Sequence, residues 1–126
     1  MKVEAKGNPK SNSEEIKENN ELELGGNILL AGFSLEPSEM IVVKKIVGHY
    51  AKKISEKTDY QDIKITLKKV EKAKSFLHEV SVSAKTGKKI LASEITHRNL
   101  YSALSSALDK VYVEAEHLAR TARQAK

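Results

Sequence analysis

A long amphipathic helix near the C-terminus is the feature that most limits how this chain can fold. Asn99 is a good N-cap, and after it apolar residues recur every three or four positions. These positions are Leu100, Leu104, Ala107 or Leu108, Val111, Ala115, Leu118 and Ala122. The spacing predicts one helix over residues 100–122 with a single apolar stripe. Such a helix needs an apolar surface to pack against.

Three segments before this helix can form that surface. Residues 63–70, IKITLKKV, alternate apolar with polar side chains, which is typical of a strand with one buried face. Residues 75–84, SFLHEVSVSA, alternate in the same way. The following KTGKK predicts a tight turn at Gly87, and residues 89–95, KILASEI, predict a last strand.

A strand and a helix precede these segments. Residues 27–33, NILLAGF, form an apolar run that predicts a buried strand. Pro37 or Ser38 can open a helix over residues 37–57, with Glu39 in its first turn. Its apolar stripe comprises Val43, Ile46, Val47, Tyr50, Ala51 and Ile54. The whole order predicts an α+β fold: a β-α-β-β-β-α sandwich whose four-stranded, mostly antiparallel sheet carries both helices on one face.

Residues 1–26 differ from the rest in composition. They hold four lysines, six glutamates and few apolar residues, so they are predicted to be a disordered arm before a domain at 27–126. Because the arm carries a net charge of −2, the formal charge of the remainder rises from +5 to +7. The basic character therefore belongs to the folded domain.

The solvent side of the first predicted helix carries mostly positive charge, more uniformly than any other surface that the sequence predicts. Lysines also cluster at the strand ends, in KKVEKAK and KTGKK, and could gather with the helix lysines into one positive trough. Lysine contacts to phosphate are additive and largely blind to base sequence, which favours a binder of folded RNA shape. The helix contributes Lys44, Lys45, His49, Lys52, Lys53 and Lys57.

Several function classes find no support in the sequence. A chain of 126 residues without cysteine can form one domain but no disulfide or thiolate site. Nucleotide-binding and hydrolase motifs are absent, so we expect no enzyme, no cofactor and no small-molecule substrate. A signal peptide and a membrane span are also absent, which predicts a cytoplasmic protein without membrane contact. The histidines fall on different predicted elements, and His78 is better explained as a hydrogen-bonded sheet residue than as a metal ligand.

From about Asn27 to the C-terminus the chain resembles the family of ribosome hibernation-promoting factor and ribosome-associated inhibitor A. The likeness lies in the strand IKITLKKVEK, the passage KILASEITHRNLYSAL and the segment NLYSALSSALDKV. In the last segment Asn99 precedes Leu100 and Tyr101, and the pair Asp109 and Lys110 follows along the helix.

The resemblance implies a factor that occupies the decoding-side channel of the small ribosomal subunit and keeps idle ribosomes inactive. Basic side chains of both helices would hold ribosomal RNA without enzymatic chemistry, and the small subunit with its rRNA would be the partner of a monomeric protein. The residues expected to bind rRNA are Lys44, Lys45, Lys52, Lys53, Lys88, Lys89, Arg98, Lys110 and Arg120.

The second helix departs from the family pattern. After Lys110 the family usually continues with further basic residues, whereas this chain has Val113, Glu114 and Glu116, which predicts fewer phosphate contacts from this helix. Two alternatives follow from the residues. One is a general binder of structured RNA on the same fold, and the other is a protein-interaction module that uses an acidic patch at Glu114 and Glu116.

Overall fold

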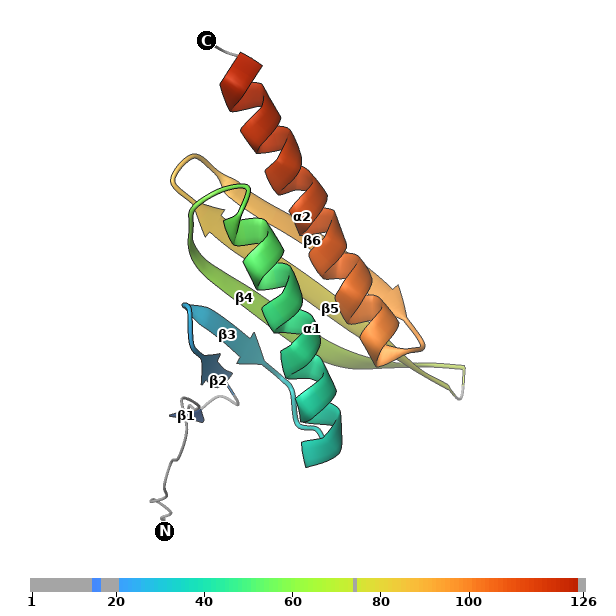
Figure 1. The fold of residues 1–126 in the computed structure, drawn as a ribbon. Coiled ribbons are helices and arrows are strands. Elements are labelled where there is room, and N and C mark those ends of the chain that lie inside the picture. The colour runs from blue at the N-terminus through green and yellow to red at the C-terminus, as the bar shows by residue number, and fades with distance from the viewer. Residues whose placement is uncertain (1–14, 17–20, 74, 125–126) are drawn as a thin grey trace.

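Six strands and two helices make up the described part of the chain, residues 15–16, 21–73 and 75–124 of the computed structural model. The strands lie side by side in the order β1-β2-β3-β4-β5-β6, and both helices cover one face of this sheet (Figure 1). The elements are β1 (Glu15–Ile16), β2 (Glu21–Leu24), β3 (Ile28–Ala31), α1 (Pro37–Ser55), β4 (Tyr60–Lys72), β5 (Ser75–Thr86), β6 (Ile90–His97) and α2 (Leu100–Gln124).

The sheet is antiparallel except at one place. β3 runs parallel to β4, and α1 is the connection between them. β4 and β5 form a long antiparallel hairpin in which Ile65 lies opposite Val82 and Leu67 opposite Val80. A mostly antiparallel sheet with both helices on one face is as the sequence predicts.

The apolar positions of strands and helices meet between the two layers. Ile63, Ile65, Val80 and Val82 are almost fully buried on the helix side of the sheet. The apolar stripes of α1 and α2 cover them with Val43, Val47, Ala51, Ile54, Leu104, Leu108 and Val111. On the other face the same strands present Lys64, Thr66, Lys68, Glu79, Ser81 and Ser83, so this polar face is also as predicted.

Both helices begin at capping residues. At the start of α1 the backbone N–H of Glu36 donates to Oε1 of Glu39 at 3.0 Å, and the Glu36 side chain accepts a backbone N–H in return. At the start of α2 Asn99 Oδ1 accepts the backbone N–H of Ser102 at 3.0 Å, which confirms Asn99 as the N-cap. α1 ends two residues before the predicted boundary and α2 two residues beyond it.

The sheet extends further toward the N-terminus than predicted. β2 pairs antiparallel with β3, and its Leu22 and Leu24 pack against the core. The sheet therefore has more strands than the four predicted, and the prediction of a disordered arm is wrong for β1 and β2. The reason is that Leu22 and Leu24 alternate with Glu21 and Glu23, so even this polar segment has one apolar face. The remainder of the predicted arm, residues 1–14 and 17–20, lies outside the described residues.

The chain leaves β3 through a glycine that no other residue can replace without strain. Gly32 has φ +80°, in the left-handed region, and a Cβ added there would collide with the carbonyl oxygen of Leu67 in β4. The close approach of these two backbones fixes where the connection from β3 to α1 begins.

Candidate RNA-binding face

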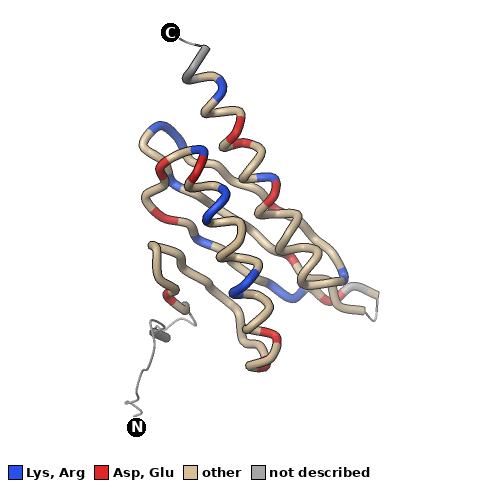
Figure 2. The backbone as a smooth tube through the Cα atoms, viewed as in Figure 1, with Lys and Arg blue, Asp and Glu red and all other residues tan. Residues whose placement is uncertain are grey.

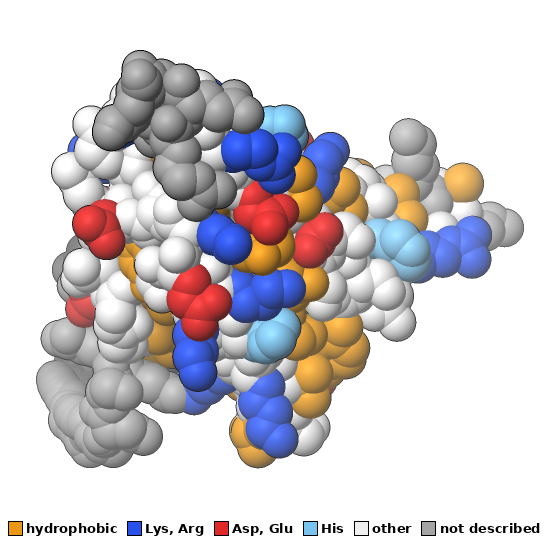
Figure 3. Space-filling view, turned by 45° about the horizontal axis from the view of Figure 1, so that its top comes forward, with side chains coloured by type: hydrophobic (Ala, Val, Ile, Leu, Met, Phe, Trp, Pro, Cys, Tyr) orange, Lys and Arg blue, Asp and Glu red, His pale blue; other side chains and the backbone are white. Residues whose placement is uncertain are grey.

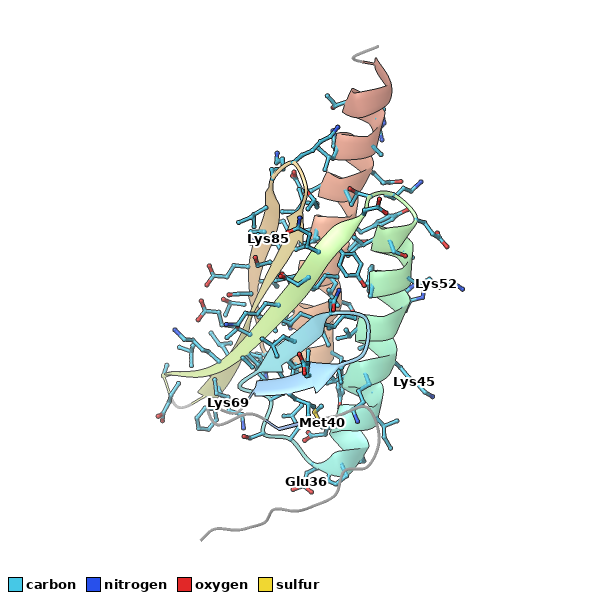
Figure 4. All side chains as sticks on the ribbon, turned by 90° about the vertical axis from the view of Figure 1, so that its left-hand side faces the viewer. Glu36, Met40, Lys45, Lys52, Lys69 and Lys85 are labelled. Atoms are coloured by element: carbon cyan, nitrogen blue, oxygen red, sulfur yellow. The ribbon has the colours of Figure 1, made fainter. Side chains whose placement is uncertain are left out.

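The exposed side of α1 carries positive charge between two acids at its ends, Glu39 in the first turn and Glu56 at the C-cap. Residues 40–55 contain four lysines and one histidine, and no Asp or Glu. Lys45 and Lys52 are exposed and project from α1 away from the sheet (Figure 4). They are seven residues apart, so they stand two helical turns, about 10 Å, from each other on the same side. We call Lys45, His49 and Lys52 the α1 basic face; Lys44 lies half-buried at its flank.

Lys53 takes a different position from the one the sequence suggests. Its Nζ lies 4.4 Å from the ring centroid of Tyr112 on α2 and 5.2 Å from that of Tyr50 on α1. Both distances suit cation–π attraction. Lys53 therefore links the two helices in the groove between them and does not extend the α1 basic face.

The groove around Lys53 also holds acidic groups from α2. Burial, and after it the neighbouring charge and hydrogen bond of Asp109, raise the pKa of Tyr50. Partial burial and then the charge of Glu116 raise the pKa of Tyr112, whose hydroxyl donates to Oε2 of Glu116 at 3.2 Å. Burial and nearby carboxylates disfavour the negatively charged form of tyrosine, so both tyrosines stay neutral well above physiological pH.

The single positive trough expected of the helix lysines and the strand-end lysines is interrupted by acidic groups where α2 meets α1. Glu116 lies 4.0 Å from the Nζ of Lys57, so α2 partly neutralises the C-terminal end of α1. In Figure 3 Lys and Arg side chains are interspersed with Asp and Glu side chains over the helices. The exposed lysines of α1 itself, Lys45 and Lys52, lie on its outer side.

The two lysine clusters at the strand ends lie at opposite ends of the molecule. KTGKK forms the turn between β5 and β6, whereas KKVEKAK lies at the turn between β4 and β5 (Figure 2). The labelled Lys85 and Lys69 mark these two ends in Figure 4. The hypothesis that both clusters extend one positive surface is therefore wrong.

The β5–β6 turn does approach the basic helix. Buried Thr86 fixes it, because its hydroxyl donates to the Lys89 carbonyl at 2.7 Å and accepts the N–H of Lys89 at 3.0 Å. Lys88 lines a hollow of about 270 Å³ together with Lys57, two residues beyond α1, and the acidic Asp59. Lys88 and Lys89 can thus prolong the positive charge of α1 beyond its C-terminus.

The other predicted site residues are distributed more widely. Arg98 is exposed at the end where both helices begin, where it lines a hollow of about 510 Å³ with Lys69, Glu36 and Glu39. Lys110 and Arg120 are exposed on α2. The structure brings together Lys45 and Lys52, and places Lys88 and Lys89 near the end of the same helix, but it does not bring Arg98 to them.

Other kinds of site find little support in the described residues. His78 Nδ1 is hydrogen-bonded to the Arg98 carbonyl at 2.8 Å, which confirms it as a hydrogen-bonded sheet residue. No three His, Asp or Glu side chains in residues 15–16, 21–73 and 75–124 gather as metal ligands would. Neither described helix is long and apolar enough to cross a membrane.

We predict that Lys53→Met weakens the fold more than it weakens RNA binding. Methionine keeps the aliphatic length but loses the charge over both tyrosine rings, which should lower the free energy of unfolding by about 1 kcal/mol. Urea unfolding and RNA titration of the same sample measure the two effects. A loss of RNA affinity as large as that of Lys52→Met would instead place Lys53 among the phosphate contacts.

Comparison with known proteins adds structural likeness. No family model matches the chain, and no curated protein matches it. Among solved structures it is similar to the crystal structure of the N-terminal domain of Protein Y from Thermus thermophilus. The TM-score is 0.47 and the sequence identity 14%, over 72% of this chain and 92% of that one. What this chain binds has to be inferred from its own side chains.

Proposed function

We propose that this protein is a ribosome-associated translation inhibitor of the hibernation type, and that the α1 basic face binds rRNA of the small subunit. The observation that carries the proposal is the exposed side of α1, where Lys45 and Lys52 project in one direction from a stretch of sixteen residues, 40–55, without a carboxylate. The resemblance of the segments around Asn99 to the hibernation factors supports the choice of the ribosome as partner.

The geometry of the face suits a phosphate backbone. Lys45 and Lys52 can each contact one phosphate, and exposed Gly48 between them has no side chain to keep the RNA at a distance. Lys88 and Lys89, both exposed, continue the contact at the β5–β6 turn. Such contacts position a folded RNA without reading its bases.

The open face of the sheet is less suited to RNA. Lys68 lies directly opposite Glu79 there, so opposite charges are paired across the strands. Among the described residues that face presents no row of aromatic side chains on which single-stranded bases could stack. This favours contact of α1 with a structured RNA surface.

The test is co-sedimentation of the chain with small ribosomal subunits over a range of salt concentrations. If two to four phosphates are contacted, log K should fall with log salt at a slope of about −2 to −4. Between 50 and 200 mM salt the affinity should then drop about tenfold to a few hundredfold. Binding that ignores ionic strength, or absence of the chain from the subunit fraction at low salt, would contradict the proposal.

A general structured-RNA binder is the second candidate, because phosphate contacts alone do not select one RNA. A generic RNA duplex that displaces the chain from ribosomes mole for mole would favour this function. The protein-interaction alternative loses its basis in the described structure. Glu114 is exposed, whereas Glu116 is half-buried beside α1 and accepts the Tyr112 hydroxyl, so the two carboxylates do not form one patch.

A further inference from the structure

The two edges of the sheet differ in how open they are to another strand. At one edge β1 has only two residues, which leaves little backbone to pair with. At the other edge β6 has eight residues and no proline, and it follows β5 without a register shift from His97 to Ile90. Among the described residues no segment pairs with the outer side of β6. Natural sheets usually shorten, bulge or cover such an edge.

The backbone groups on that outer side can be identified from the ladder. The backbone N–H of Thr86 donates to the Lys89 carbonyl at 3.0 Å, so this pair is hydrogen-bonded toward β5. In an antiparallel ladder hydrogen-bonded and non-hydrogen-bonded pairs alternate. Every second residue of β6 therefore turns its N–H and C=O outward: Ile90, Ala92, Glu94 and Thr96.

We infer that this edge pairs with β6 of a second copy of the chain, antiparallel about a two-fold axis at Ser93. In this register Ala92 lies opposite Glu94 of the partner subunit, and Ile90 opposite Thr96 of the partner subunit. All four outward-facing residues then meet outward-facing residues, which gives about eight backbone hydrogen bonds. The inference is independent of the proposed RNA binding and differs from the monomer expected from the sequence.

The side chains favour this register over its neighbours. An axis at Glu94 would place two glutamates opposite each other, which is unfavourable. With the axis at Ser93, buried Leu91 faces Ile95 of the partner subunit on the helix side of the sheet. Ile95 is only partly buried at the margin of the core, so the pairing would continue the core from one copy into the next.

The helix layer leaves room for the second copy. Ser93 Oγ donates to the Ala107 carbonyl at 2.6 Å, and α2 packs on both β5 and β6, so its axis is set back from the edge. The pairing brings the two α2 helices side by side near this point. Tyr112 and Glu116 point toward α1. The exposed residues on the opposite side of α2 include Ser106, whose side chain is small, and Lys110, whose side chain is flexible, so both can make way for the second helix.

Two substitutions of opposite charge at Ala92 test the inference. Ala92 is exposed on the sheet face away from the core, so Ala92→Glu and Ala92→Lys should both leave the fold intact. Because of the two-fold axis, the dimer contains two contacts in which residue 92 of one copy faces Glu94 of the partner subunit. We therefore expect the dimer dissociation constant to rise about two- to thirtyfold in Ala92→Glu and to fall by a similar factor in Ala92→Lys.

Sedimentation equilibrium of the nuclease-treated full chain over a range of concentrations gives these constants. Ala92→Pro removes an outward N–H without breaking a hydrogen bond to β5, and should yield a monomer with an unchanged circular dichroism spectrum. If this variant fails to fold, the comparison of Ala92→Glu with Ala92→Lys still tests the inference. A wild-type chain that stays monomeric to millimolar concentration, or a dimer that both charged variants leave unchanged, would overturn the inference.

Two further outcomes have a defined meaning. A monomeric wild type that binds an extended peptide along β6 would show that the edge takes a different occupant, which also overturns the inference. Lys45→Glu/Lys52→Glu should dimerise like the wild type, because neither lysine lies near β6. If that variant loses RNA binding but still dimerises, the two properties are independent. One proposal can then fail without the other.

Discussion

Replacing Gly32 by alanine is expected to lower the free energy of unfolding by about 3 kcal/mol or more. Gly32 adopts φ +80°, which L-amino acids rarely tolerate, and its Cβ would overlap the Leu67 carbonyl of β4. Relief of that overlap has to move β3 away from β4 at the one parallel pair of the sheet. Urea unfolding followed by circular dichroism measures the loss.

Gly48 provides the matched control. It lies exposed inside α1, has an ordinary φ and meets nothing within 4 Å of an added Cβ. Alanine there removes the helix penalty of glycine, so Gly48→Ala should raise the free energy of unfolding by about 1 kcal/mol. Equal effects of the two substitutions would contradict the close contact between Gly32 and Leu67.

The double variant Lys45→Glu/Lys52→Glu is expected to reduce the affinity for small ribosomal subunits about a hundredfold or more at low salt. Two attractive phosphate contacts become repulsive, and the charge of the α1 basic face changes by four units. Both side chains are exposed and project away from the core, so the fold should be unchanged. Co-sedimentation at 50 mM salt measures the effect.

A variant with the same change in net charge on the opposite side of the molecule separates a specific face from general attraction. Lys64→Glu/Lys68→Glu alters two exposed lysines on the open face of the sheet. We expect it to lose far less affinity than the α1 variant. A similar loss in both would mean that net charge alone holds the chain on the ribosome.

The periodicity of the sequence was enough to predict most of the fold. Burial on one side of a helix or a strand imposes a repeat in the sequence, and the stripes of α1 and α2 and the alternation in β4 and β5 follow it. β2 was not predicted, because only Leu22 and Leu24 mark its buried face in a segment of polar composition. A strand close to the edge of a sheet needs few apolar residues, since its inner neighbour already covers the core.

The candidate site was less predictable, for two different reasons. The exposure of Lys45 and Lys52 follows directly from the apolar stripe of their own helix. The position of Lys53 does not, because it depends on Tyr112, which only the packing of α2 against α1 brings close. The separation of the two lysine clusters could have been foreseen. They flank the twelve residues of β5, and a strand of that length spans about 40 Å.

The order in which the core is completed has a consequence for when the protein can act. α2 supplies seven of the twenty buried apolar residues of the described core, and it comes last among the described elements along the chain. It also provides Tyr112, which holds Lys53 and through it the C-terminal half of α1. A nascent chain therefore lacks the support that orients its basic helix until α2 has been synthesised and has packed on the sheet.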